Sequence, residues 1–345
     1  MLFRKEELMV STIAIAKYAG VSQTTVSRVL NKPNQVKKET YNKVMAAIDE
    51  YGYSAEAKEK MNKPKAVNTI RVLAAANDSV LFNGAMLSIV DGAAKQGLFV
   101  NIHLDAPVSK EALFDELVSE GTAGVIISAL VVEDRLVEKM NQSSIPFVLL
   151  NADHPNSSYS VCMNNAEAAY SAVSHLIETG HQEIAWIGGT LTSQTNKDGL
   201  LGAIHALQAN KHKIRKKRLV ITDTDKASLY EAFEKLQNLK KKPTAIVAST
   251  DKIAIQLMEF YQTAGRKVPE DISIIGLGNS EFGVHPAIGL TSVGVTDTNE
   301  ELGQEAVSIL LNAINRKKSE SQHVKKEVSL FERNTTLPLF VEQQF

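Results

Sequence analysis

Residues 11–31, STIAIAKYAGVSQTTVSRVLN, contain two short amphipathic segments on either side of a glycine. In the first segment, apolar residues recur at helical spacing, at Ile13, Ile15, Ala16 and Ala19. Ser11 stands in the N-cap position of that segment, and Gly20 ends it. Ser22 can cap the second segment, where Val26 and Val29 turn inward. The pattern predicts two helices joined by a tight turn, a helix-turn-helix.

The outward face of the second segment is polar and consists of Gln23, Thr24, Ser27, Arg28 and Asn31. A helix-turn-helix enters the major groove of DNA with the start of its second helix, so we expect Gln23 and Thr24 to meet base edges. Arg28 is placed to reach a base or a phosphate. An ordinary helical hairpin with a packing role fits the periodicity equally well, so spacing alone leaves both interpretations open.

Composition and charge narrow the class of protein. A chain of 345 residues suits two or three domains, and 44% hydrophobic with 22% charged residues is typical of a globular protein with a sizeable core. No apolar run reaches the roughly 18 residues of a membrane span, and the N-terminus lacks a signal-peptide core, so we expect a cytoplasmic protein. Residues 1–65 carry a net charge of +5 and the remainder −6, as expected where one small domain contacts phosphates.

From Ile70 onward, short apolar runs alternate with helical stretches such as residues 85–96. The runs lie at residues 70–76, 98–104, 124–130, 146–151, 183–189, 244–249 and 273–278. Continuous apolar runs separated by helices predict parallel sheets covered on both faces. The runs are too many for one sheet of ordinary size, so the α/β fold predicted here has two doubly wound lobes. Ligands bind such folds at the carboxyl ends of the strands.

Residues 16–31, AKYAGVSQTTVSRVLN, with Lys43, Val44 and Gly52-Tyr53, closely resemble the headpiece of the lactose/galactose repressor family of bacterial transcription regulators. Three further segments resemble the core of the same family, at residues 175–189, 268–279 and 331–336. That core is similar to periplasmic sugar-binding proteins. The resemblance implies an all-α helix-turn-helix headpiece and a two-lobed core. It also implies that the chain crosses between the lobes near residues 161, 291 and 326.

The resemblance suggests a division into domains: residues 1–10 as an extension, 11–53 as the DNA-binding domain with a third helix from about Lys38 to Tyr51, 54–69 as a hinge, and 70–340 as the effector-binding and dimerisation domain. It implies a repressor that binds a near-palindromic DNA operator as a homodimer and has no cofactor, metal or membrane partner. The expected DNA contacts are Thr12, Ser22, Gln23, Thr24, Thr25, Ser27, Arg28, Asn31, Tyr53, Met61 and Asn62.

The hinge departs from the family, in which a leucine from each subunit wedges into the minor groove and kinks the operator. Counting without gaps from Gly52-Tyr53 puts Asn62 in the place of that leucine, with Met61 beside it. Asparagine is a poor wedge, so we expect weaker bending of the operator. Lysines of the hinge are expected to attract phosphates instead, namely Lys58, Lys60, Lys63 and Lys65.

Family members usually hold a small effector between the lobes with an arginine and an aspartate, whose places are taken here by Gly199 and Gly278. Two alternatives stay open: a repressor without an effector, or a sugar-binding protein with a vestigial headpiece. In the remaining interpretation, other polar groups bind a larger effector. Residues 192–202 resemble the corresponding segment of maltose and oligosaccharide regulators. The expected effector-binding residues are Asn77, Phe82, Asn83, Ser128, Asn151, Lys197, Gly199, Thr250, Asp251, Gly278 and Asn279.

No enzyme motif stands out. The turn at residues 188–190, Gly-Gly-Thr, lacks the lysine of a phosphate-binding loop. Four histidines have neither metal-ligand spacing nor a nucleophile partner and are expected to be solvated or to cap helices: His175, His181, His205 and His212. The single cysteine, Cys162, is expected to be a small core residue. We expect the basic segment at residues 211–219 to be a solvated loop, not a second nucleic-acid site.

Overall fold

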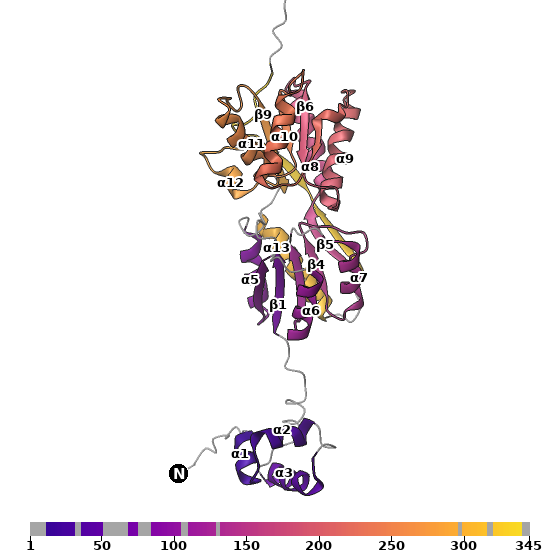
Figure 1. Cartoon of the computed structure of the whole chain (residues 1–345), viewed down its shortest axis with the longest axis vertical. Helices are drawn as coiled ribbons and strands as arrows, with labels where there is room; N and C mark the ends of the chain where they lie inside the picture. The colour runs from indigo at the N-terminus through magenta and orange to yellow at the C-terminus, as the bar shows by residue number, and fades with distance from the viewer. Residues whose placement is uncertain are drawn as a thin grey trace, which may run out of the picture. The chain divides into compact units, whose positions relative to one another are not determined.

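The structure is a computed structural model that describes residues 12–31, 36–50, 68–74, 84–104, 110–128, 132–295, 299–315 and 320–339 (Figure 1). The chain forms two compact units, Met1–Val67 and Asn68–Phe345. The predicted extension and most of the predicted hinge lie outside the described residues. None of the helices in the described part of the chain is long and apolar enough to cross a membrane.

The described residues of the first unit form the helices α1 (Thr12–Tyr18), α2 (Gln23–Asn31) and α3 (Lys38–Glu50). Their inner faces form one small apolar core, made by Ile15, Ala16, Val26, Val29, Val44, Ala47 and Ile48. Both helices of the predicted helix-turn-helix are therefore confirmed. The third helix begins where the sequence predicts, and Tyr51, which was expected at its end, lies outside the described residues.

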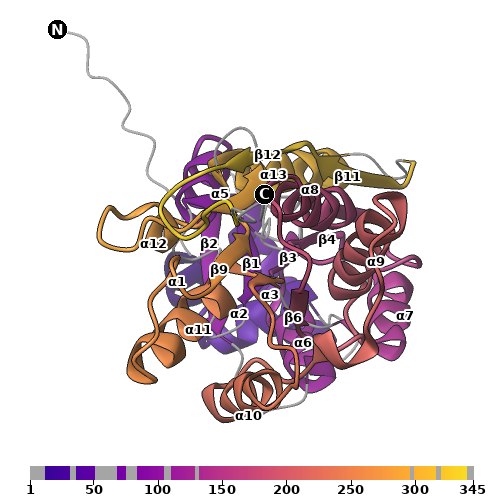
Figure 2. The same cartoon turned by 90° about the horizontal axis from the view of Figure 1, so that it is seen from above.

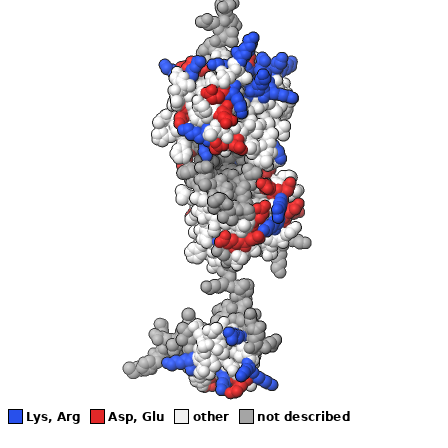
Figure 3. Space-filling view, viewed as in Figure 1, with Lys and Arg blue, Asp and Glu red and all other residues white. Residues whose placement is uncertain are grey.

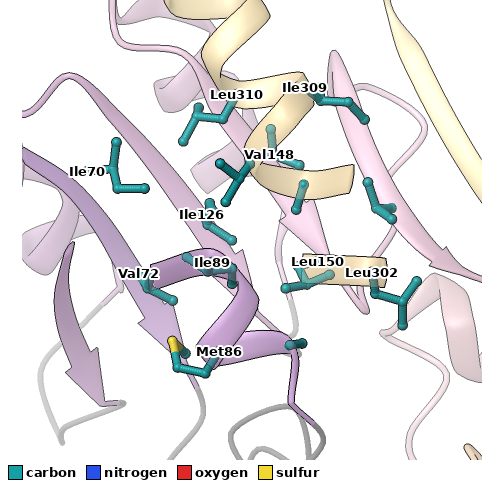
Figure 4. Close-up of a cluster of buried hydrophobic side chains, with 14 of the residues drawn as sticks. Ile70, Val72, Met86, Ile89, Ile126, Val148, Leu150, Leu302, Ile309 and Leu310 are labelled. Carbon is teal, nitrogen blue, oxygen red and sulfur yellow. The ribbon is translucent and has the colours of Figure 1, made fainter. Parts of the chain in front are cut away.

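The second unit contains two six-stranded sheets. The first sheet is parallel throughout, in the order β11-β5-β4-β3-β1-β2. Its strands are β1 (Thr69–Ala74), β2 (Phe99–Leu104), β3 (Gly124–Ser128), β4 (Phe147–Leu150), β5 (Tyr159–Met163) and β11 (Gln322–Lys326). Its helices are α5 (Ala85–Ala94), α6 (Lys110–Glu120), α7 (Asp134–Gln142) and α13 (Asn299–Asn315). Apolar residues of α5 and α13 pack on one face (Figure 4), and those of α6 and α7 on the other.

The second sheet has the order β12-β10-β9-β8-β6-β7, and β12 runs antiparallel to β10. Its strands are β6 (Ile184–Gly188), β7 (Leu219–Ile221), β8 (Ala245–Ala248), β9 (Ser273–Leu277), β10 (Ser292–Val295) and β12 (Val328–Phe331). Its main helices are α8 (Asn165–Glu178), α9 (Gln194–Ala209), α10 (Lys226–Gln237) and α11 (Asp251–Thr263). Helices α8 and α9 cover one face, and α10 and α11 the other (Figure 2). The predicted two-lobed α/β fold is confirmed.

The chain passes between the two sheets three times, after Met163, after Val295 and after Lys326. The sequence places these crossings near residues 161, 291 and 326. The strands that precede them, β5, β10 and β11, each leave their sheet at the carboxyl end. Because most neighbouring strands run parallel to these, the carboxyl edges of the two sheets are turned toward each other. Ligand-binding groups of a doubly wound fold are expected at such edges.

The basic segment after α9 forms an irregular stretch, the short helix η3 (Lys216–Arg218) and the start of β7. Its lysines are exposed, and Figure 3 shows Lys and Arg side chains gathered on this lobe. Arg218 differs, because it is buried, pairs with Glu183 and donates a hydrogen bond to the Lys241 carbonyl oxygen at 2.8 Å. The prediction of a solvated loop is therefore confirmed for the lysines. It is wrong for Arg218, whose buried contacts hold the segment in place.

Candidate nucleic-acid interface and effector site

The turn before α2 fixes the start of that helix. Gly20 has a φ of +63°, a left-handed conformation that glycine adopts readily, and it reverses the chain after α1. The Ser22 hydroxyl accepts a hydrogen bond from the Thr25 backbone N–H at 3.1 Å, and the Ser22 and Thr25 hydroxyl oxygens lie 2.9 Å apart. Ser22 is therefore the predicted N-cap, and the first turn of α2 is held by its own side chains.

The predicted DNA-contacting residues of α2 form one polar face. Gln23, Thr24, Ser27 and Arg28 are exposed, whereas Val26 and Val29 on the opposite face are buried in the headpiece core. Thr25 is half-buried. Thr12 begins α1 and Asn31 ends α2, and their side chains are outside the description. The remaining expected contacts, Tyr53, Met61 and Asn62, fall outside the described residues.

Several residues predicted to bind an effector lie at the facing carboxyl edges of the two sheets. Ser128 ends β3, is completely buried, and its Oγ has no hydrogen-bond partner within the described part of the chain. Asn151 follows β4 with a φ of +50°. Thr250 follows β8 and caps α11, because its hydroxyl accepts a hydrogen bond from the Ile253 N–H at 3.2 Å. Asn77, Phe82 and Asn83 lie outside the described residues.

Asp251 is fully buried, and its hydrogen bonds join segments that are distant in the sequence. Its carboxylate accepts hydrogen bonds from the Ser280 backbone N–H and from the Ser292 hydroxyl, each at 2.6 Å. Burial raises the pKa of this carboxyl group, and the hydrogen bonds from Ser292 and Ser280 oppose that rise. Gly276 faces the same carboxylate, and a Cβ there would overlap it. Both oxygens of Asp251 are thus used by the protein itself.

The loop after β9 contains the second departure from the family. Gly278 has a φ of +124°, a conformation that strains residues with a side chain, and Asn279 has a φ of +48°. The Asn279 side-chain oxygen accepts a hydrogen bond from Arg333 at 2.6 Å, and its backbone N–H donates to the Ser292 hydroxyl at 3.0 Å. Arg333 is not among the predicted residues, yet it holds the loop in which Gly278 and Asn279 lie.

The place of the family's arginine is occupied by an indole ring. A Cβ on Gly199 would lie 3.1 Å from Cη2 of Trp186, which extends from β6 under the start of α9. A Cβ on Gly188 would lie 2.6 Å from the Nε1 of the same ring. Trp186 is 2% exposed and therefore sits between two glycines. Lys197, two residues before Gly199, is exposed.

An ion pair joins the two lobes close to these edges. Lys325 Nζ of β11 lies 2.9 Å from Asp198 Oδ2 of α9, and the other oxygen of Asp198 accepts a hydrogen bond from Gln194 at 2.8 Å. The hydrogen bond from Lys325 to Asp198 raises the pKa of the lysine, so the lysine stays charged at neutral pH. The pair links the first sheet to a helix of the second lobe.

The buried ring of His181, outside these edges, has structural partners. The ring nitrogens of His181 lie 3.0 Å from the Thr244 hydroxyl and 3.0 Å from the Leu337 carbonyl oxygen, and burial lowers its pKa. The prediction of a solvated or capping histidine is therefore wrong for His181, and His175 is buried as well. Cys162 is buried as predicted, which raises its pKa to about 12. Within the described residues, no group of His, Cys, Asp and Glu is suited to hold a metal ion.

Two family models match the chain. The one described as "Bacterial regulatory proteins, lacI family" matches residues 14–56, and the one described as "Periplasmic binding protein-like domain" matches residues 173–336. The HTH-type transcriptional repressor PurR of Erwinia tasmaniensis is 30% identical over 327 residues, which cover 93% of this chain and 95% of that protein. The PurR of Actinobacillus pleuropneumoniae is 29% identical over 314 residues, 89% and 92% of the two chains.

Solved structures share the fold over nearly the whole length. The transcriptional regulator CelR in complex with cellobiose matches with a TM-score of 0.70 at 25% identity, over 94% of this chain and 99% of that one. The lac repressor dimer bound to its operator and the anti-inducer ONPF gives a TM-score of 0.69 at 25% identity, over 95% and 99%. Because sequence and structure match through the headpiece and both lobes, the chain belongs to the lacI family of bacterial regulatory proteins.

Proposed function

We propose that the protein is a sequence-specific transcriptional repressor that acts in the cytoplasm, binds a near-palindromic operator as a homodimer and responds to a small effector. The observation that carries the proposal is the exposed polar face of α2, Gln23, Thr24, Ser27 and Arg28, on a helix whose start is capped by Ser22. Such a face matches the donor and acceptor pattern of the major groove. Exposed Lys17, Lys37 and Lys38 add cations that attract phosphates.

An apolar surface on the first lobe supports the homodimer. Helix α5 exposes Leu87 and Val90, and the edge strand β2 exposes Ile102 and Leu104. Val100, which alternates with Ile102 and Leu104 along β2, packs with the residues of α5, so these four side chains share one face of the sheet. We name Leu87, Val90, Ile102 and Leu104 the lobe-one apolar face. A cluster of this kind on a regulator that reads two half-sites suits an isologous contact with a second copy.

Regulation is proposed to act at the facing edges of the two sheets. CelR was solved with cellobiose and the lac repressor with ONPF, and we infer a small, sugar-like effector for this chain as well. An effector that binds one arrangement of the lobes more tightly shifts the population toward it, and the shift is limited by that difference in affinity. The Asp198–Lys325 ion pair joins both lobes at this place and would respond to such a shift.

Arg28→Ala is expected to weaken operator binding by about 1–3 kcal/mol, because a charged contact at a base or phosphate is lost. The measurement is a mobility-shift titration with duplexes that the unmodified chain selects from a random pool. If Arg28 reads a base, the variant also loses its preference at one operator position.

The matched control is Lys43→Ala, which removes one cation from α3, where Lys43 pairs with Glu39 at 3.0 Å. It is expected to change affinity slightly and equally for all duplexes. Unchanged operator binding by Arg28→Ala would contradict the proposed orientation of α2. Substitutions of Gln23 and Thr24 should alter preference at neighbouring positions of the operator.

A further inference from the structure

Two buried hydrogen-bonding groups of the second lobe have no partner at the edge that faces the first lobe. Trp186 Nε1 and Ser249 Oγ are both buried, and neither has a hydrogen-bond partner within the described part of the chain. A buried donor without a partner costs folding free energy, and native proteins keep few of them. Each such group therefore calls for a partner that the described part of the chain does not supply.

The two groups converge on one point of the sheet. Gly188 ends β6, and a Cβ there would lie 2.6 Å from Trp186 Nε1 and 3.2 Å from Ser249 Cβ. Ser249 directly follows β8, the neighbour of β6. The indole N–H and the hydroxyl thus border the same place at the carboxyl edge. From the opposing sheet, the buried Ser128 Oγ at the end of β3 also lacks a partner in the described residues.

The indole reaches this place because residue 199 is a glycine. A side chain at Gly199 would press on the far end of the ring, where even a Cβ would lie 3.1 Å from Cη2. The family's arginine and Trp186 in its present position therefore compete for the same space. Where the family has the guanidinium of an arginine on α9, this chain has glycine at 199 and a neutral indole N–H from β6.

We propose that Trp186 Nε1 and Ser249 Oγ hydrogen-bond an oxygen of an uncharged effector, a hydroxyl or a carbonyl oxygen, at the carboxyl edge of the second sheet. This proposal rests on the proposed function. The effector is uncharged because the buried charges at these edges are already compensated. Asp251 is bound by Ser280 and Ser292, and Arg333 donates to Asn279 and to the Leu290 carbonyl oxygen. At these edges, the buried groups of the described residues that remain without partners, Trp186 Nε1, Ser249 Oγ and Ser128 Oγ, are neutral.

The chain contains a single tryptophan, so the emission of Trp186 reports directly on this place. The full chain is titrated with neutral probes (cellobiose, maltose, maltotriose, inosine and guanosine) and with charged probes (hexose monophosphates and bisphosphates). We expect at least one neutral probe to change the emission of Trp186 and raise the Tm. The sugars and nucleosides separate the two sources of a neutral oxygen. Binding of the charged probes alone, or of no probe at all, would overturn the proposal.

Variants then test the two groups. Trp186→Phe removes the N–H and Ser249→Ala the hydroxyl, and each is expected to weaken binding of the responding probe about tenfold by calorimetry. Ser249→Ala without the probe should keep its Tm or raise it, because an unpartnered hydroxyl is removed, whereas a purely structural role would lower the Tm. The matched control is Ser174→Ala, which removes another buried hydroxyl without a partner in the described residues, from α8, and should leave affinity unchanged.

Unchanged affinity in both Trp186→Phe and Ser249→Ala would overturn the proposal while leaving the repressor function intact. Operator binding by the unmodified chain is measured in parallel. If the chain selects no duplex from a random pool, the proposed function itself fails. The two failures are therefore distinguishable, because one concerns the effector groups and the other the headpiece.

Discussion

Leu87→Asp is expected to convert the protein into a monomer at micromolar concentration and to weaken operator binding at least about 100-fold. Leu87 is 75% exposed in the single chain and belongs to the lobe-one apolar face. A two-fold contact buries it twice, and each buried leucine contributes about 1.5–3 kcal/mol. An aspartate in its place would leave two uncompensated charges in an apolar contact. Two headpieces joined in a dimer bind two half-sites with an effective concentration that separate monomers lack.

Sedimentation velocity of the full chain measures the first effect, and a mobility-shift titration the second. Because Leu87 is exposed in the single chain, the substitution should change the free energy of unfolding of the monomer by only about 0.5 kcal/mol. The control is Leu201→Asp, which changes a leucine of α9 that is 61% exposed and lies on the other lobe. A dimer that survives Leu87→Asp but dissociates with Leu201→Asp would place the contact on the second lobe.

The headpiece was predictable from sequence because its determinants are local. Ile15, Val26 and Val29 lie within fifteen residues of one another, and the helical period places Ile15 on the apolar face of α1 and Val26 and Val29 on that of α2. Gly20 and Ser22 mark the end of one helix and the start of the next through their own backbone and side-chain chemistry. The resemblance to the family then distinguished a DNA-reading hairpin from an ordinary one, which periodicity could not do.

Five strands were not predicted as strands, and they lack the continuous apolar run on which the other predictions depend. β11, QHVKK, pairs with β5 at the edge of the first sheet, and β7 is a three-residue edge strand of the second. An edge strand has one neighbour and is partly solvated, so its sequence need not be apolar. β10, SVGV, lies inside the sheet but is short and interrupted by Gly294. Only the register with its neighbours identifies such segments.

The effector site was the least predictable part, because its contacts join distant segments. The sequence identified Gly199 as a lost arginine but not the ring of Trp186, thirteen residues earlier, that fills the space. It also placed Asp251 among effector contacts, whereas the carboxylate is occupied by Ser280 and Ser292. One signal was available: a lone tryptophan inside an otherwise small and aliphatic strand, two residues before a pair of glycines, is unusual and pointed to this place.

The contact of α8 with α9 depends on Gly202, and Gly202→Ala is expected to lower the free energy of unfolding by about 2 kcal/mol or more. A Cβ at this position would overlap the carbonyl oxygen of Ala166 in α8. A backbone atom cannot rotate away as a side chain does, so the two helices must separate. The higher helix propensity of alanine, about 1 kcal/mol, offsets only part of this cost.

Gly199→Ala provides the matched comparison, since it makes the same change one turn earlier in α9. There the new Cβ meets Trp186 Cη2 at 3.1 Å, the far end of a side chain, which can give by a few tenths of an ångström. We expect a change in stability below about 1 kcal/mol for Gly199→Ala, because propensity and crowding nearly cancel. Denaturant unfolding measures both variants.

The emission of Trp186 shows whether the damage reaches the effector site. Separation of α9 from α8 in Gly202→Ala also lifts the start of α9 from the indole ring, so water gains access and the emission shifts to longer wavelength. Gly199→Ala keeps the ring covered and should retain the emission of the unmodified chain. Equal stability of the two variants would contradict the close approach at Gly202. A destabilised Gly202→Ala with unshifted emission would instead show that the indole is held by the sheet and not by α9.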